Sequence, residues 1–394
     1  MPVSDHDHIG ARIAAHRKRA GLTQQGLAQL IPYSYSLLRH VEAGHRAASP
    51  QLLTAVARAL RVDVSALAGP PMGPVQSARI TALLRPVREA LDLHDLPLDP
   101  GVTPRPADQL TTEADAMCRL VRAAHLQQAA AALPGLLAEL TVACRETPTS
   151  HTWAALASAC RSAHDIATKL GRYDLAALAL DRMGLAADRA SDPVLGALRQ
   201  YKRALAYRSP ESQHRIGLAM AAEGRRMIEQ ADDSTVARAV QGQLHLGAAV
   251  IAARADLPAE AEQHLARAGA IAARTGEVGR IYWLSFGPTN VATHAVYAWL
   301  ALRRFEEAYT AARAVRMPSG WATSRRAGYL VDRSVAEMET GRTEAALKSL
   351  SAARQLAPQQ TRVHPRVRET VRALLHMCRQ APDPLTRMAS WVGV

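Results

Sequence analysis

Aromatic side chains are scarce in this sequence. Phe, Trp and Tyr together make up 4% of the chain, whereas hydrophobic residues reach 48%, most of them Ala and Leu. Strands favour aromatic and β-branched residues, whereas Ala and Leu favour helices, and no segment alternates in the way a strand requires. The composition therefore predicts an all-α fold.

The signatures of catalytic and metal sites are also missing. The four cysteines lie far apart without a Cys-x-x-Cys pair, so zinc and redox motifs are unsupported and buried free thiols are expected. There is no Gly-x-Ser-x-Gly elbow, no phosphate-cradling glycine loop and no His-Glu-x-x-His. The tract Asp5-His6-Asp7-His8 is more typical of a disordered terminus than of a metal site. We expect neither an enzyme nor a bound cofactor.

Long apolar runs are lacking as well. No stretch approaches the roughly 18 uncharged apolar residues of a membrane span, and residues 1–10 lack the apolar centre of a signal peptide. We therefore expect a cytoplasmic protein without membrane contact. The net charge of +13 permits a polyanionic partner, but an Arg-rich coding bias gives the same value. Residues 1–68 hold 8 Arg and Lys against 4 Asp and Glu, so charge alone does not locate a nucleic-acid site.

Two proline-rich stretches divide the chain. Residues 69–74 end a first domain, because adjacent prolines cannot continue a helix, and a second stretch covers residues 96–108. A helix over about residues 77–94 should connect them. We predict an N-terminal domain over residues 1–68, a proline-rich linker with this connecting helix over 69–108, a helical repeat domain over 109–380 and a C-terminal tail over 381–394.

Residues 8–68 have the pattern of a five-helix helix-turn-helix domain. Gly21 ends the first helix, Thr23 caps the second and Ser34 caps the third. The third helix, residues 35–42, repeats its apolar side chains at helical spacing, so the other side chains face outward; these are Tyr35, Ser36, Arg39 and His40. A fourth helix follows Ser49-Pro50, and a short closing helix covers residues 64–67.

The motifs Leu22-Thr23-Gln24, Leu27-Ala28, Val41-Glu42-Ala43-Gly44 and Val56-Ala57 resemble the Cro/λ-repressor (XRE) family of transcriptional regulators. The resemblance implies that the third helix lies in the major groove of double-stranded DNA. It also implies an ion pair between Arg17 and Glu42. Carried over residue by residue, the resemblance implies that Tyr35, Ser36 and His40 contact base edges and that Arg39 contacts a base or a phosphate. It implies that Gln24 clamps a phosphate and that Arg46 contacts the DNA backbone. The predicted DNA-binding set is completed by Gln25 and Ser34.

The turn before the third helix departs from that family. The family usually has Gly there, and this chain has Pro32. Because Gly can take a positive φ and Pro cannot, we expect the turn to differ locally. We expect that difference to change the angle of the third helix.

From about Thr111 onward, helical segments alternate with short breaks at Gly, Pro or Asp. These segments read as pairs of helices. In several pairs the second helix begins with a turn residue, then an aromatic residue or Leu, then acidic residues and Ala, as at residues 171–176, 304–308 and 341–346. The interval of 17 residues from Gly341 to Pro358 fits the second half of a tetratricopeptide repeat. We predict a tetratricopeptide-like α-solenoid with a concave inner face; a generic α-bundle is the alternative.

Residues 280–375 resemble actinobacterial regulators of this two-domain type, through Phe286-Gly287-Pro288-Thr289-Asn290, Tyr329-Leu330-Val331-Asp332 and His364-Pro365-Arg366. The layout is also similar to that of the peptide-pheromone receptors of Gram-positive bacteria, a likeness of architecture alone. An Asn amide can bind an extended peptide backbone, and Arg can hold a carboxylate. The candidate ligand-binding residues are Tyr282, Trp283, Asn290, Arg325, Arg326 and Tyr329. Alternatively, residues 287–290 start a helix and the aromatic side chains fill the core.

These interpretations combine into a DNA-binding transcriptional regulator whose repeat domain dimerises and senses a peptide or small-molecule effector. One domain of about 60 residues reads only a few base pairs, so we expect a homodimer on a two-fold-symmetric site. The rival hypothesis is a protein–protein adaptor whose repeats hold a partner protein. A gel shift on the promoter upstream of the protein's own gene discriminates between them.

Overall fold

The computed structural model divides the chain into two helical units, residues 1–77 (unit 1) and residues 78–394 (unit 2). It describes residues 9–43, 48, 50–62, 67, 74–97, 99, 101–208, 213–231, 233–279, 281–378 and 382–394. Across these ranges the only β-type pairing is a single antiparallel bridge between Val278 and Phe286. None of the helices in them is both long enough and apolar enough to cross a bilayer.

In unit 1 the end of the first helix and the starts of the second and third coincide with the predicted Gly21, Thr23 and Ser34. The helices are α1 (Ile9–Arg19), α2 (Gln24–Gln29), α3 (Tyr35–Glu42) and α4 (Pro50–Leu60). Gly21 takes a φ of +69° after α1, and the Leu22 amide donates to the Arg17 carbonyl at 3.1 Å, which is the Schellman arrangement of a helix end. The hydroxyl oxygens of Thr23 and Ser34 accept amide hydrogen bonds at the starts of α2 and α3.

A single apolar core joins these helices. Its fully buried side chains include Ile13, Leu27, Leu38, Val56 and Leu67. The closing helix predicted at residues 64–67 lies outside the described residues except for Leu67, which is part of this core. Residues of the core come from every described helix of unit 1, so the domain packs around one centre.

Helices α1 and α3 approach each other at backbone distance. A Cβ atom built on Gly10 would lie 1.7 Å from the carbonyl oxygen of Val41. That distance is far below any contact between real atoms, so only glycine fits at this position. Gly10 therefore sets how closely α3 can lie against α1.

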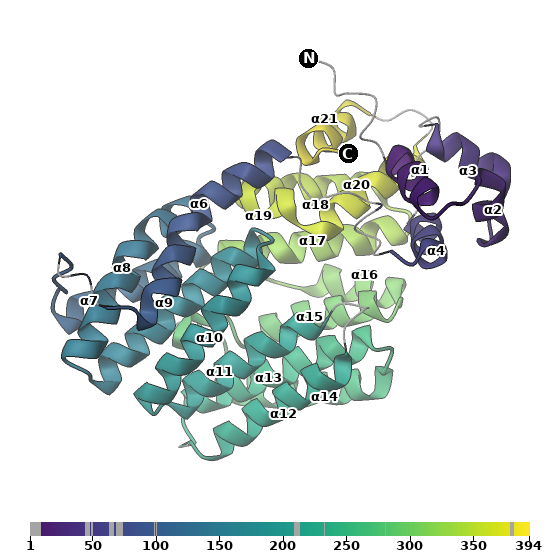
Figure 1. Cartoon of the computed structure of the whole chain (residues 1–394). Coiled ribbons are helices and arrows are strands. Elements are labelled where there is room, and N and C mark those ends of the chain that lie inside the picture. Colours follow the sequence, from purple (N-terminus) through teal and green to yellow (C-terminus); the bar gives the residue numbers. More distant parts are fainter. Residues whose placement is uncertain are drawn as a thin grey trace. The chain divides into compact units, whose positions relative to one another are not determined.

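Unit 2 is a series of helix hairpins (Figure 1). Its helices in chain order are α6 (Pro74–Asp92), which begins at the boundary with unit 1, η1 (Leu93–Asp95), α7 (Ala107–Arg122), α8 (Leu126–Glu146), α9 (Ser150–Lys169), α10 (Tyr173–Ala190), α11 (Pro193–Ala204), η2 (Leu205–Arg208), α12 (His214–Glu229), α13 (Thr235–Arg254), α14 (Pro258–Thr275), η3 (Ile281–Trp283), α15 (Pro288–Ala301), α16 (Phe305–Ala314), α17 (Thr323–Glu339), α18 (Thr343–Leu356), α19 (Pro358–Val363), α20 (Pro365–Met377) and α21 (Asp383–Val392).

Neighbouring helices pair as α7 with α8, α9 with α10, α11 with α12, α13 with α14, α15 with α16 and α17 with α18. First helices also contact one another between hairpins, as α11 does with α13, α13 with α15 and α15 with α17. Helix α7 contacts α17 as well, so this inner layer curves back on itself. The structure thus confirms an all-α fold, with a helix-turn-helix unit followed by a solenoid-like helical body.

Both ends of unit 2 are covered by segments that the sequence analysis placed outside the repeats. The connecting helix α6 buries Ile80, Leu84 and Val87, and its Leu91 carbonyl accepts a hydrogen bond from Arg182 of α10 at 3.1 Å. Residues 381–394, expected to be a tail, contain α21. The side chains of that helix form a core with α18 and α20, so the C-terminal segment is packed structure.

We expect Gly10→Ala to destabilise unit 1 by about 3 kcal/mol, the upper end of the cost of overpacking, because α1 and α3 must separate. Gly328→Ala in α17 is the matched control, since an added Cβ there meets nothing within 4 Å, and should stabilise unit 2 by about 0.5–1 kcal/mol. Chemical denaturation measures both. All five tryptophans lie in unit 2, so circular dichroism detects the unit 1 transition and tryptophan fluorescence does not. An unchanged unit 1 transition in Gly10→Ala would refute the close approach.

Candidate nucleic-acid interface

Helix α3 presents a polar face to solvent. Its residues Ser36, Arg39 and His40 are exposed, and Tyr35 is 41% exposed. On the opposite side Leu38 and Val41 are fully buried or nearly so. The four side chains predicted to face outward therefore form one accessible strip along α3.

Local hydrogen bonds orient part of this strip. The Nδ1 atom of His40 lies 2.7 Å from the carbonyl oxygen of Ser36. A carbonyl only accepts, so His40 carries a proton on Nδ1. At the start of the helix, Ser34 accepts from the Leu37 amide at 3.2 Å and keeps its own hydroxyl proton to donate. Gln25 is exposed in the first turn of α2.

A buried network fixes α3 to the first two helices. Arg17 binds Glu42 through two hydrogen bonds, Nε to Oε1 at 2.7 Å and Nη2 to Oε2 at 2.8 Å, which confirms the predicted ion pair. Its Nη1 also donates to the Leu22 carbonyl at 2.8 Å. The hydrogen bond to Glu42 raises the pKa of Arg17, so this guanidinium stays charged.

Gln24 belongs to the same network. Its amide nitrogen donates to Glu42 Oε2 at 2.8 Å, so one N–H of the amide is engaged within the domain. The second N–H remains able to donate to a phosphate oxygen. Glu42 therefore positions the residue that the sequence analysis assigned as the phosphate clamp.

The turn between α2 and α3 is built around Pro32. The Tyr33 amide donates to the Ile31 carbonyl at 2.8 Å, a three-residue γ-turn whose central φ suits proline. None of residues 30–34 takes a positive φ. The local difference expected from Pro32 is therefore present, and the turn needs no glycine.

Positive charge dominates the described surface of unit 1. Among its described residues Glu42 is the only one with a carboxylate side chain, and Arg17 neutralises it. The exposed charged side chains there are all basic, namely Lys18, Arg19, Arg39, Arg58 and Arg61. Such a surface attracts a polyanion without a competing carboxylate. Arg46, the predicted backbone contact, lies outside the described residues.

The candidate ligand-binding residues of unit 2 are engaged within the unit. Tyr282 donates its hydroxyl to Asp192 at 2.7 Å, and Trp283 donates Nε1 to Asp115 at 2.7 Å. Their backbone carbonyls accept hydrogen bonds from Arg161 and Arg122. Segment η3 is therefore fastened to α7, to α9 and to the residue that caps α11.

Asn290 and Tyr329 are buried. Asn290 has no exposed surface and donates to Gln243 at 3.0 Å, which itself donates to the Tyr201 hydroxyl at 2.6 Å. The Tyr329 hydroxyl donates to the Ala312 carbonyl at 2.6 Å. In this conformation both side chains are engaged in hydrogen bonds within unit 2.

The two predicted arginines are less enclosed. Arg325 lies 3.5 Å from the Asn290 side-chain oxygen, and Arg326 donates to the Pro318 carbonyl at 3.1 Å. Both are half-buried. The partners Arg122 and Arg161 were not predicted, because they lie on helices far away in the sequence and carry no motif.

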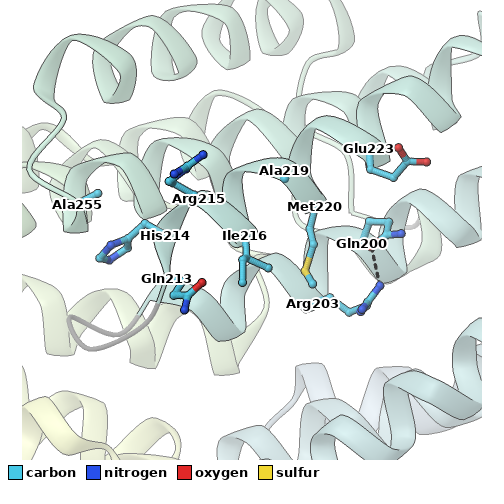
Figure 2. A pocket seen from close by; sticks show the side chains of 10 residues that line it. All are labelled: Gln200, Arg203, Gln213, His214, Arg215, Ile216, Ala219, Met220, Glu223 and Ala255. Atoms are coloured by element: carbon cyan, nitrogen blue, oxygen red, sulfur yellow. Dashed lines mark hydrogen bonds between the residues drawn. The ribbon is translucent and has the colours of Figure 1, made fainter.

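A groove of about 1030 Å³ runs beside α11 and α12 (Figure 2). Figure 2 shows Ile216 and Met220 of α12 on one side and a hydrogen bond from Arg203 to Gln200 of α11, at 3.2 Å. None of the six candidate ligand-binding residues lines this groove. The predicted ligand set and this surface hollow are therefore separate features.

We expect Glu42→Ala to destabilise unit 1 by about 3–5 kcal/mol, because it leaves the buried Arg17 charge without a partner. The double variant Arg17→Leu/Glu42→Leu removes both charges and should be more stable than Glu42→Ala. Denaturation followed by circular dichroism measures the difference. If Glu42→Ala costs no more than a surface substitution, of about 0.5 kcal/mol, the network does not hold α3 in place.

Comparison with known proteins points to the same domain. Residues 8–68 match the family model of a helix-turn-helix domain. Over 61 residues the chain is 38% identical to YazB of Bacillus subtilis (strain 168), an uncharacterized HTH-type transcriptional regulator, and the match covers 16% of this chain and 88% of that protein. No solved structure matches the chain significantly. Through residues 8–68, the chain belongs to the family of helix-turn-helix transcriptional regulators.

Proposed function

We propose that this protein is a sequence-specific transcriptional regulator of the Cro/λ-repressor (XRE) type, which reads double-stranded DNA with α3. The observation that carries the proposal is the exposed polar strip of α3, on a unit whose described surface has no unpaired carboxylate. An α-helix fits the major groove of B-form DNA, where polar side chains can distinguish base pairs.

The residues divide into readers and positioners. We assign base-edge contacts to Ser36, His40 and Tyr35, and a contact with a base or a phosphate to Arg39. Gln24 and Gln25 lie at the start of α2, and Ser34 lies at the start of α3. We propose that these three side chains donate hydrogen bonds to phosphate oxygens and that Arg46 is a further contact to the DNA backbone. Phosphate contacts fix the register of the protein on DNA, whereas base contacts select the sequence.

The two classes should respond differently to substitution. On a duplex selected from a random pool, Ser36→Ala and His40→Ala should change the preference at one or two base pairs, each by about 1–3 kcal/mol. Gln24→Ala should weaken binding to all duplexes alike. Fluorescence anisotropy on the selected duplex and its single-base variants measures both effects.

His376→Ala, at an exposed position of α20, is the matched control for His40→Ala and should leave DNA binding unchanged. If His40→Ala matches this control in affinity and in base preference, the assignment of α3 as the reading helix is wrong. Because Gln24 also binds Glu42, Gln24→Ala could weaken DNA binding by destabilising unit 1. Thermal unfolding of this variant shows whether unit 1 keeps its stability, in which case the weaker binding comes from the lost phosphate contact.

We further propose that the protein acts as a homodimer. One small domain reads only a few base pairs, and two half-sites about one helical turn apart supply the missing specificity. Light scattering should give twice the chain mass of 42.4 kDa, and the selected duplex should be two-fold symmetric. A mass of 42.4 kDa both free and bound to DNA would contradict the dimer.

For unit 2 we propose a tetratricopeptide-like repeat body that dimerises and senses a peptide or small-molecule effector in the cytoplasm. Each hairpin contacts mainly its neighbours, so small rotations between hairpins can add up to a change in curvature. An effector shifts DNA affinity only as far as it prefers one curvature over another, typically about 5–150-fold. The inner layer of first helices, where Arg325 is located, is the surface that such a change would alter most.

A further inference from the structure

A short segment between α14 and α15 contacts hairpins that lie much earlier in the chain. Residues 281–285, here called the inner segment, have hydrogen-bond partners on α7, on α9 and at the cap of α11. Next to the inner segment, Val278 and Phe286 exchange two backbone hydrogen bonds, of 2.6 and 3.0 Å. The inner segment is thus anchored beside α15 and held by side chains 90 or more residues earlier.

Two arginines hold the backbone of the inner segment. Arg161 of α9 donates to the Tyr282 carbonyl, and Arg122 of α7 donates to the next carbonyl, that of Trp283, at 2.7 Å. Arg161 is only 4% exposed, so its guanidinium depends on acceptors that come from protein or ligand. Backbone carbonyls are present in every peptide, and these two contacts therefore do not depend on its sequence.

Two carboxylates bind the side chains of the same two residues. The Tyr282 hydroxyl donates to Asp192 at 2.7 Å, and the Trp283 indole donates to Asp115 at 2.7 Å. The guanidinium of Arg119 lies 5.4 Å from the centre of the Trp283 ring, within range of a cation–π contact. Each of the two residues is therefore bound both through its backbone and through its side-chain tip, the combination by which proteins recognise peptides of defined sequence.

The inner segment is held in an unfavourable backbone conformation. Tyr282 has a φ of +42° and Trp283 a φ of +52°, in the left-handed region that bulky L-residues rarely adopt. Such residues persist only where the surrounding contacts hold them, and they occur most often at ligand clamps and switch regions. A separate peptide that reaches the same partners with an ordinary backbone avoids this cost, so it can compete with the inner segment.

We propose that the side chains that hold the inner segment form a peptide-binding site, which the inner segment occupies as an internal pseudo-ligand. These side chains are Asp115, Arg122, Arg161 and Asp192. The external ligand is a short peptide in which a tyrosine precedes a tryptophan, and its binding displaces Tyr282 and Trp283.

Displacement of the inner segment also removes its contacts with three successive hairpins, those that begin with α7, α9 and α11. Because the inner segment is tethered, it competes at a high effective concentration, and an external peptide binds more weakly than it would to an empty site. That this peptide is the effector of the regulator rests on the function proposed above; the binding site itself does not.

The test measures how the full-length protein binds a fluorescein-labelled, C-terminally amidated peptide Ile-Tyr-Trp-Leu-Ser, the sequence of residues 281–285, by fluorescence anisotropy. The double variant Tyr282→Ala/Trp283→Ala empties the site. It should bind one peptide per chain, at least about tenfold more tightly than the wild type, in which the inner segment competes. The peptide Ile-Phe-Phe-Leu-Ser keeps both rings without their donors and should bind the double variant at least about tenfold more weakly.

A third substitution tests the carboxylate that binds the indole. Asp115→Ala, added to the double variant, should weaken peptide binding at least about tenfold, as expected for a lost hydrogen bond to a charged group. Asp108→Ala in the same helix is the matched control, because its side chain is fully exposed, and should change the affinity less than about twofold.

Circular dichroism shows whether the variants keep their helices. If Tyr282→Ala/Trp283→Ala unfolds, Tyr282→Phe/Trp283→Phe keeps both rings and takes its place, and it should still bind the peptide more tightly than the wild type. The proposal is overturned if the peptide does not bind the double variant, if the wild type binds it equally well, or if Asp115→Ala or loss of the two donors leaves the affinity unchanged. No DNA is present in these experiments, so their outcome is independent of whether the protein regulates transcription.

Discussion

A buried ion pair controls the geometry of the DNA-binding unit. Arg17 and Glu42 have side chains only 9% and 4% exposed and lie 2.7 Å apart, and Glu42 also binds Gln24. The last residue of α3 thereby holds α1 through Arg17 and the first residue of α2 through Gln24. Because two desolvated charges stabilise each other only in a narrow geometry, the buried pair sets the angle at which α3 presents Ser36, Arg39 and His40.

Unit 1 could be predicted from the sequence because its signals are local. The caps at Thr23 and Ser34 act on amides three residues away, and Gly21 acts on the turn that it ends. Gly10 was not recognised, because its partner is the Val41 carbonyl on another helix and a glycine inside a helix looks the same whether or not a backbone approaches it. Local chemistry predicts elements, whereas close approach between elements depends on tertiary structure.

In unit 2 the sequence predicted the helices but not the roles of single polar residues. The spacing of small and aromatic residues predicted helix hairpins, but the roles of single polar residues depend on partners far away in the chain. Asn290 binds Gln243, 47 residues earlier, and Arg122 binds Trp283 across 161 residues.

The central claim is that α3 reads base edges in the major groove. Methylation interference on the duplex selected from a random pool tests it most directly, because methylation at guanine N7 blocks the major groove and methylation at adenine N3 blocks the minor groove. Interference at guanine N7 inside two symmetric half-sites, with none at adenine N3 there, is the predicted result. Interference at adenine N3 alone would contradict it and would place the protein in the minor groove.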